Sequence, residues 1–159
     1  MKLTLDKWKA QDYEAFFRAS QDDRLRANMT DTFPKTREEC RQIVLSFSQS
    51  TDTTEYIRAI RIDGQIVGCI AAFFDSDRHG AELAYWLDSV YWNQGIMTQV
   101  VLLFIQRLLS LFDLRRVCAR PFVSNRVSQR VLEKAGFHCQ GLSGESGRKT
   151  FILNLDSKL

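Results

Sequence analysis

The sequence predicts one α/β (α+β) domain over residues 1–159, with a mixed, mostly antiparallel central sheet flanked by helices on both faces. Two patterns support this fold class. The middle of the chain reads as three strands joined by tight turns, and the part after it reads as helix, strand, helix, which implies a crossover onto the same sheet. A composition of 45% hydrophobic and 26% charged residues argues against a disordered or fibrous chain.

The N-terminal part is expected to begin with a short strand and an amphipathic helix. Residues 2–6 alternate between polar and apolar side chains, which is the pattern of a strand. Tyr13, Phe16 and Phe17 recur at helical spacing and predict a helix over residues 10–20. Each of these elements would have one apolar face of its own.

A second helix is expected to begin at Thr36. Thr36 and Glu39 form a T-x-x-E capping box, in which each side chain bonds a backbone amide at the helix start. An apolar stripe with helical spacing follows this box. The stripe consists of Cys40, Ile43, Val44 and Phe47.

The centre of the chain predicts a three-stranded antiparallel meander. YIRAIRI and QIVGCIAAFF flank Asp63-Gly64, a strong hairpin signal because both turn residues adopt positive φ. A second turn, SDRHG, precedes AELAYWL. We therefore expect strands at residues 56–62, 65–74 and 81–87.

The second half of the chain predicts two helices, of which the first is long and apolar. It follows the turn YWNQG and runs to about Phe112. RRVCARPF predicts a strand at 115–121. SNRVSQRVLEKAGF predicts another helix, with Ser124 or Asn125 as N-cap and Gly136 as its left-handed stop. Two short strands are expected near 138–142 and 149–155.

The stretch YWNQGIMT, residues 91–98, places a glycine directly before the most apolar helix. The first amides of a helix have no intrahelical partner, and the helix dipole adds positive potential, so such a turn suits a phosphate that approaches closely over Gly95. Taken alone, a glycine at this position more often only forms the turn that precedes a helix. The stretch contains neither the Walker pattern nor the dinucleotide pattern G-x-G-x-x-G.

A second motif strengthens the phosphate interpretation. DSVYWNQGIMT, an apolar helix, a strand and then N-x-x-S-x-x-V-L-E-K-A-G-F together resemble the GNAT superfamily of N-acetyltransferases. The YW-x-x-G-I-M-T form is similar to the branch that includes the ribosomal-protein N-terminal (Rim-type) acetyltransferases. This resemblance covers residues 56–142, while the N-terminal helices and the final hairpin match in order only.

The resemblance implies that acetyl-CoA binds where the strand at 81–87 splays away from the strand at 115–121. The pantetheine arm would pair with the strand end at Trp86 and Leu87, and Asn125 would contact the same arm. The pyrophosphate would lie on the backbone amides of Asn93, Gln94, Gly95, Ile96, Met97 and Thr98.

Three positions depart from the pattern of the family. Trp92 and Met97 stand at the first and last positions of Gln/Arg-x-x-Gly-x-Gly/Ala, but backbone amides bind phosphate whatever their side chains are. Gln94 stands where the branch often carries lysine, which weakens the attraction for phosphate.

Acetyl transfer to an amine needs a base, donors for the developing oxyanion and a proton for the thiolate. Ser128 lies one helical turn after Asn125, so its hydroxyl is the candidate donor to the thiolate; the alternative is a solvent-facing serine. Glu82 is the candidate base, expected among apolar neighbours that make a carboxylate a better proton acceptor; the alternative is an exposed strand-end glutamate. We expect direct attack in a ternary complex, because no cysteine has a partner that suggests covalent catalysis.

Charge and composition exclude several other functions. A net charge of +3 is low for a dedicated nucleic-acid binder, so nucleic acid is not an expected partner. Basic residues in the second half of the chain are left as a nucleic-acid surface or a solvated face, and Arg126 and Arg130, four residues apart on one helix, also as contacts to the 3′-phosphate of CoA. The basic residues are Arg115, Arg116, Arg120, Arg126 and Arg130. The four cysteines and two histidines show no ligand spacing, so we expect no metal. Neither a signal peptide nor a membrane-spanning run is found, which predicts a cytoplasmic protein without a membrane partner.

The acceptor is the part of the function that the sequence constrains least. It is expected to be a primary amine, on a protein N-terminus or on a small molecule. Specificity would come from residues 20–35 and 143–149, with Asp22, Asp23 and Asp31 as acidic candidates. The alternative to an enzyme is a non-catalytic module of the same fold that binds an acyl-CoA or a protein. A homodimer is suggested by analogy alone.

Overall fold

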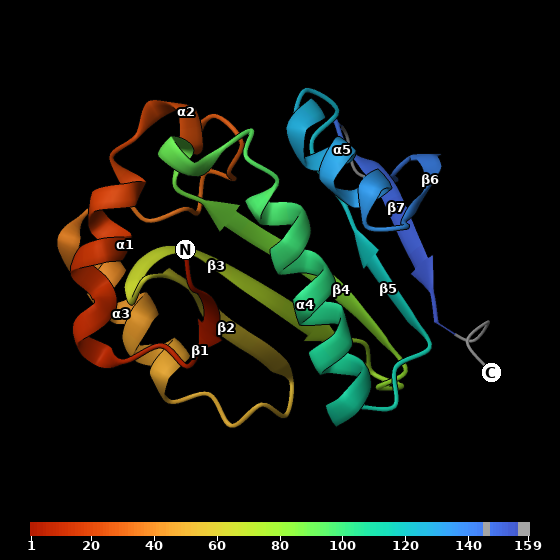
Figure 1. The fold of residues 1–159 in the computed structure, drawn as a ribbon, viewed down its shortest axis with the longest axis horizontal. Helices are drawn as coiled ribbons and strands as arrows, with labels where there is room; N and C mark the ends of the chain where they lie inside the picture. The colour runs from red at the N-terminus through yellow and green to blue at the C-terminus, as the bar shows by residue number, and fades with distance from the viewer. Residues whose placement is uncertain (145–146, 156–159) are drawn as a thin grey trace. The chain divides into compact units, whose positions relative to one another are not determined.

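The structure is a computed structural model, which describes residues 1–144 and 147–155. Residues 145–146 of the expected acceptor loop therefore lie outside the described residues. Figure 1 shows the order of helices and strands. The elements are β1 (Leu3–Asp6), η1 (Ala10–Asp12), α1 (Tyr13–Ser20), α2 (Asp23–Arg26), α3 (Arg37–Ser48), β2 (Glu55–Ile62), β3 (Gln65–Phe74), β4 (Gly80–Leu87), η2 (Ser89–Tyr91), α4 (Ile96–Leu111), β5 (Arg116–Ala119), α5 (Arg126–Lys134), β6 (His138–Leu142) and β7 (Lys149–Asn154).

The chain divides into two compact units. The N-terminal unit comprises Met1–Ala71 with Tyr85–Gln94, and the C-terminal unit comprises Ala72–Ala84 with Gly95–Leu159. The strands are hydrogen-bonded in the order β1-β2-β3-β4-β5-β7-β6. β4 and β5 pair in parallel, whereas β1–β2, β5–β7 and β6–β7 pair antiparallel. The predicted mixed, mostly antiparallel sheet with helices is confirmed, and the single domain over residues 1–159 stays a prediction.

The hairpin between β2 and β3 turns at the two residues that the sequence predicts. Asp63 has a φ of 50° and Gly64 a φ of 83°, the positive values that a tight hairpin turn requires. The carboxylate of Asp63 also accepts the N–H of Lys2 at 2.7 Å. This contact ties the turn to the start of the chain.

Helix α3 begins at the predicted cap, although only half of the predicted capping box forms. The hydroxyl of Thr36 accepts the N–H of Glu39 at 3.1 Å, a cap that stabilises a helix by about 1 kcal/mol. The carboxylate of Glu39 accepts the N–H of Lys35 at 3.2 Å, one residue before the predicted partner. The extended backbone at Thr36 brings this earlier amide within reach.

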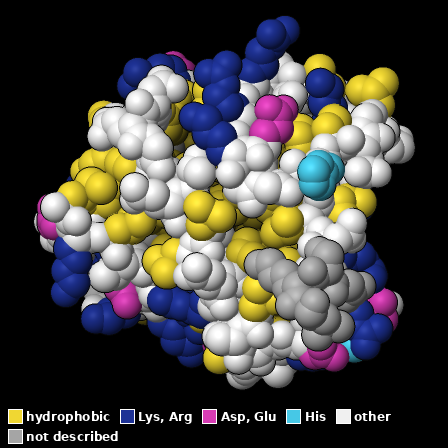
Figure 2. Space-filling view, turned by 45° about the vertical axis from the view of Figure 1, so that its right-hand side comes forward, with side chains coloured by type: hydrophobic (Ala, Val, Ile, Leu, Met, Phe, Trp, Pro, Cys, Tyr) yellow, Lys and Arg dark blue, Asp and Glu magenta, His cyan; other side chains and the backbone are white. Residues whose placement is uncertain are grey.

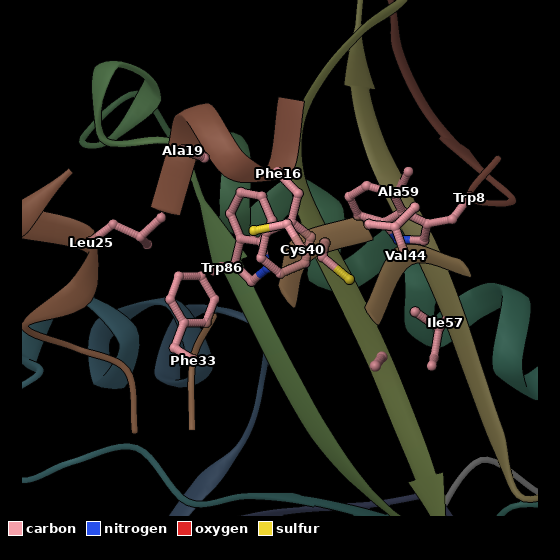
Figure 3. Packing of buried hydrophobic residues seen from close by; sticks show 12 residues of the cluster. Trp8, Phe16, Ala19, Leu25, Phe33, Cys40, Val44, Ile57, Ala59 and Trp86 are labelled. Carbon is pink, nitrogen blue, oxygen red and sulfur yellow. The ribbon is translucent and has the colours of Figure 1, made fainter. Parts of the chain in front are cut away.

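Aromatic side chains fill the core of the N-terminal unit (Figure 3). The ring of Trp86, on β4, lies 5.0 Å from that of Phe16 and 6.2 Å from that of Phe33. Trp8 packs against Phe16 at 5.8 Å. Such ring pairs contribute about 0.5–1.5 kcal/mol each beyond the area they bury. Behind Trp86, β3 and β4 approach closely, because a Cβ at Gly68 would lie 2.4 Å from the Trp86 carbonyl oxygen.

In the C-terminal unit, the parallel pairing of β4 with β5 ends at Leu83 opposite Ala119. β5 ends at this pair, earlier than predicted, because Pro121 follows shortly and has no N–H for a ladder. β4 continues to Leu87. The last residues of β4 therefore lie beyond its pairing with β5.

Helix α4 is apolar over most of its surface, as predicted. Its exposed apolar residues include Leu102 and Leu111. Among the helices of the described residues, none has the length and apolar character needed to cross a membrane. The buried side chains of α4 are Ile96, Met97, Val100, Val101, Phe104, Ile105 and Leu108.

Helix α5 stops at the predicted glycine. Gly136 has a φ of 97°, and its N–H donates to the carbonyl of Glu133 at 3.0 Å. The N–H of Phe137 donates to the carbonyl of Leu132 at 2.9 Å, which completes a Schellman motif. The β6–β7 hairpin follows, close to its predicted boundaries.

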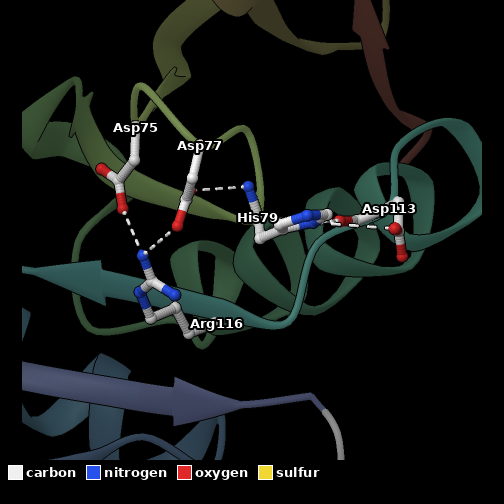
Figure 4. A network of polar contacts seen from close by, with 5 residues as sticks. All are labelled: Asp75, Asp77, His79, Asp113 and Arg116. Atoms are coloured by element: carbon white, nitrogen blue, oxygen red, sulfur yellow. Dashed lines mark hydrogen bonds and ion pairs between the residues drawn. The ribbon is translucent and has the colours of Figure 1, made fainter.

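Polar contacts fix the turn between β3 and β4 to the start of β5 (Figure 4). The guanidinium of Arg116 donates to Asp75 at 3.0 Å and to Asp77 at 3.2 Å. The backbone N–H of His79 and the guanidinium of Arg116 lower the pKa of Asp77. The ring Nδ1 of His79 lies 3.6 Å from the carboxylate of Asp113. The turn between β3 and β4 is therefore held to β5 by the ion pairs of Arg116.

Candidate active site

The loop between β4 and α4 is shaped by its own hydrogen bonds. The indole Nε1 of Trp92 donates to the carbonyl of Leu87 at 2.7 Å, and the side-chain amide of Gln94 donates to the carbonyl of Val90 at 3.0 Å. Asn93, with a φ of 60°, adopts the left-handed conformation. The loop therefore turns sharply before the helix begins.

Ser89 ties the same loop to helix α2. Its buried hydroxyl donates to the carboxylate of Asp22 and accepts from the guanidinium of Arg24 at 2.8 Å. The bond from Ser89 lowers the pKa of Asp22, which also caps α2 by accepting the N–H of Arg24 at 2.9 Å. Asp22, expected as an acidic contact for an amine, therefore has a structural role in this loop.

Helix α4 begins after an exposed glycine, whereas its first two residues, Ile96 and Met97, are buried. Gly95 is its N-cap, with a φ of 73°, and in the described chain no side chain caps this helix and no acidic residue lies in its first turn. The amides of Ile96, Met97 and Thr98 are the first N–H groups of the helix, which have no partner within it. A Cβ at Gly95 would meet nothing within 4 Å. The space beside Gly95 is compatible with an anion at this helix start, which stays a prediction.

At the end of β4, the backbone of Trp86 faces β3 and that of Leu87 faces the opposite side. The carbonyl of Trp86 lies against Gly68 of β3, and the N–H of Asp88 also bonds to β3. Backbone groups alternate between the two sides of a strand, so the opposite edge belongs to Tyr85 and Leu87. Both the side chain and the backbone of Trp86 therefore face the N-terminal unit, whereas Leu87 lies on the opposite edge and is itself buried, with its carbonyl bonded to the indole of Trp92.

Glu82 forms an ion pair with Arg120, the residue that follows β5. Its Oε1 lies 2.6 Å from Nη1 of Arg120, and the two side chains are 41% and 33% exposed. The prediction that Glu82 lies among apolar neighbours is therefore wrong, because its carboxylate contacts a guanidinium. In the parallel register Glu82 lies opposite Cys118, and Arg120, two residues on, points to the same side. The sequence contains both residues but not the register that joins them.

Asn125 and Ser128 meet at the start of α5. The side-chain oxygen of Asn125 accepts the N–H of Ser128 at 3.1 Å, which confirms Asn125 as the N-cap and excludes the alternative, Ser124. The neighbouring side chain of Val127 is 46% exposed. The two residues predicted to face the ligand from this helix therefore lie in one short turn.

The arginines predicted to contact an anionic ligand differ in their contacts. Arg116 and Arg120 form ion pairs with carboxylates, whereas Arg126 and Arg130 are exposed on α5. On the face drawn in Figure 2, several Lys and Arg side chains gather along the upper edge, and others lie among apolar and uncharged ones. The two ion-paired arginines are less available to a phosphate than the two exposed ones.

The four cysteines are free thiols. Burial raises the pKa of Cys69 to about 12 and also raises the pKa of Cys40. Within residues 1–144 and 147–155, no group of three or more His, Cys, Asp or Glu side chains is arranged to hold a metal ion.

The fold thus combines a mixed sheet, one parallel strand pair and a helix that starts at a left-handed glycine. A family model described as "Acetyltransferase (GNAT) domain" matches residues 2–138. The chain therefore belongs to the GNAT acetyltransferases, and the resemblance seen in the sequence is confirmed.

Individual relatives agree with this family. The "Probable N-acetyltransferase YjcK" of Bacillus subtilis (strain 168) is 34% identical over 83 residues, which are 51% of this chain and 46% of that protein. The chain thus spans about half the length of this curated relative.

Two solved structures have a similar fold. One is RimL, a ribosomal L7/L12 alpha-N-protein acetyltransferase in complex with coenzyme A, with a TM-score of 0.86, 18% identity and coverage of 99% of this chain and 96% of that chain. The other is the microcin C7 self immunity acetyltransferase MccE in complex with acetyl-CoA and AMP, with a TM-score of 0.83, 17% identity and coverage of 97% and 93%.

Proposed function

We propose that this protein is an acetyl-CoA-dependent N-acetyltransferase, an acyltransferase that acetylates a primary amine. The observation that carries the proposal is the uncapped start of α4 behind Gly95, in a chain that belongs to the GNAT family. Three backbone amides and the helix dipole converge there and favour a pyrophosphate.

The residues present fit acetyl-CoA. The left-handed Gly95 leaves space beside the backbone, so phosphate oxygens can approach the amides from Asn93 to Thr98. The edge of β4 at Leu87 pairs with the pantetheine arm in the manner of an added strand. Asn125, held at the start of α5, bonds the same arm.

Acetyl-CoA supplies the acetyl group as a thioester, so that a C–N bond to the amine forms, the C–S bond breaks and CoA leaves as a thiol. Glu82 accepts the proton that the amine loses, directly or through water, while Arg120 fixes the direction of the carboxylate. Ser128 donates a hydrogen bond from its hydroxyl to the departing thiolate, and the sulfur takes up, through water, the proton that the amine lost to Glu82. Because burial raises the pKa of the Cys40 and Cys69 thiols, both are poor nucleophiles, which supports direct attack without an acyl-enzyme.

The acceptor is a primary amine of a protein N-terminus or of a small molecule. The similarity in fold to RimL, whose name gives a ribosomal protein as acceptor, supports the first class. The expected acidic contacts support a cationic small molecule less well, because Asp22 is used as a helix cap.

One observation favours a non-catalytic module with the same fold. The carboxylate of Glu82 is engaged by Arg120, which competes with its use as a base. Such a module binds CoA but releases no thiol.

Thermal unfolding with acetyl-CoA, CoA and ATP at equal concentration tests the proposal. A ligand at a hundredfold excess over its Kd stabilises the native state by about 2.7 kcal/mol, so we expect a clear rise in Tm with both CoA species and little with ATP. Thiol release is then measured with N-terminal peptides, polyamines, aminoglycosides and amino acids as acceptors. No rise in Tm overturns the proposal, and CoA binding without thiol release from any acceptor supports the module.

A further inference from the structure

A buried glutamine holds the segment that leads from β5 into α5. Gln129, on α5, is 8% exposed. Its Nε2 donates to the carbonyl of Phe122 at 3.1 Å and to that of Val123 at 2.8 Å. Because both N–H groups of this side-chain amide donate to one loop, the loop is fixed to the helix.

The β7 side of the sheet holds the same segment by backbone bonds. The N–H of Val123 donates to the carbonyl of Gly147 at 2.8 Å, and the N–H of Lys149 donates to the carbonyl of Pro121 at 3.0 Å. The segment is therefore held in a clamp, both by α5, which follows it directly, and by residues 147–149, which are distant from it in sequence.

Arg148 completes this clamp. Its guanidinium donates to the carbonyl of Arg120 and lies over the ring of Phe122, 4.2 Å from the centroid. As a result, each of the four carbonyls of residues 120–123 accepts a hydrogen bond from the protein. A loop in which every carbonyl is paired has little freedom to change its direction.

We propose that Gln129 is a positioning residue of the acetyl-CoA site. Its amide holds Phe122 and Val123, which lie three and two residues before the N-cap, and the path of this segment decides where Asn125 presents its side chain. The inference rests on the proposed function, in which Asn125 bonds the pantetheine arm. Gln129 is buried and acts only through Asn125. Its replacement should therefore change the affinity for CoA as well as stability.

The test compares Gln129→Met with a matched control. Methionine keeps the length of the side chain and removes both N–H donors, so the Kd for CoA and the KM for acetyl-CoA should rise by about tenfold, with a much smaller change in kcat. The control is Ser20→Ala, which removes a buried hydroxyl that donates to the carbonyl of Phe17 at 2.7 Å in the N-terminal unit. It should lower Tm and leave the Kd for CoA unchanged.

A second variant separates hydrogen bonding from packing. Gln129→Glu keeps the shape but turns a carboxylate towards two carbonyls, and protonation restores one donor. Its affinity for CoA, relative to wild type at the same pH, should therefore recover as pH falls from 8 to about 5. A purely packing role predicts no recovery.

The possible failures are distinguishable. Wild-type protein that does not bind CoA overturns the proposed function. Wild type and Gln129→Met with equal affinity for CoA overturn the positioning role alone. Loss of cooperative unfolding in both Gln129 variants also overturns it, because Gln129 would then act in stability.

Discussion

Glu82 on β4 and Arg120 after β5 meet at 2.6 Å because the parallel register places both side chains on one side of adjacent strands. The pair gives the candidate base a fixed direction. It also means that a neutral side chain at position 82 can keep a hydrogen bond with Arg120. Charge and geometry can therefore be separated at this position.

Glu82→Gln should lower kcat by about 10²–10⁴-fold, the usual contribution of a general base, and leave the Kd for CoA unchanged. Glutamine still accepts from Arg120 but does not take a proton. Steady-state thiol release and thermal shift with CoA measure the two quantities. The control is Glu38→Gln, which neutralises the exposed carboxylate beside Arg41. Unchanged kcat in Glu82→Gln would remove Glu82 from the reaction.

Gly95→Ala should destabilise the protein by about 1–2 kcal/mol and weaken CoA binding. The φ of 73° strains an L-residue, and the added methyl occupies the open side of the helix start. Gly64→Ala is a matched control, since Gly64 has a φ of 83° and also has nothing within 4 Å. It should cost similar stability without affecting CoA. Equal loss of CoA affinity in both variants would contradict a phosphate site at Gly95.

Gly68→Ala should destabilise the protein by about 3 kcal/mol, the upper part of the range for overpacking. Its Cβ would lie 2.4 Å from the carbonyl oxygen of Trp86, and backbone on a central strand yields little. Gly144→Ala is the control, because a Cβ there meets nothing within 4 Å. Urea denaturation measures both. A change below about 0.5 kcal/mol at Gly68 would show that β3 and β4 are farther apart than described.

Stability should fall as pH drops below about 4. Hydrogen bonds from Arg41 lower the pKa of Glu38 from 4.5 to about 2, and bonds from Ser89 and His79 lower those of Asp22 and Asp77. Each carboxyl thus has a lower pKa in the folded chain than in the unfolded chain. Its contribution is complete above the unfolded pKa and is lost as pH falls through the folded one.

Tm measured from pH 6 to pH 2 checks this dependence. Glu38→Gln removes one of the groups and should flatten the acid limb slightly, because the pair with Arg41 is exposed. A Tm that stays level from pH 4 to pH 2 would contradict the lowered pKa values.

Local chemistry made much of the fold predictable. Asp63-Gly64, Gly136 and the cap at Asn125 each have a backbone requirement that only a few residue types meet. The left-handed glycine at the start of α4, Gly95, follows from the same rule. Signals of this kind are complete within a few consecutive residues.

The contacts that the sequence did not reveal depend on register or on distant segments. Glu82 meets Arg120 only once β4 and β5 are aligned, and the direction of the Trp86 backbone depends on which strand lies beside it. The bond between Ser89 and Asp22 joins residues far apart in the chain. Gln129 reads as an ordinary polar residue of a helix until the path of its neighbouring loop is known.

The clamp on residues 120–123 has a consequence for dissecting this protein. The family model ends at residue 138, yet two of the four carbonyls in that segment take their donors from Arg148 and Lys149. A fragment cut at the family boundary would retain every residue proposed to contact acetyl-CoA and lose the support of the loop before Asn125. The boundary of sequence similarity is therefore not the boundary of the smallest active piece.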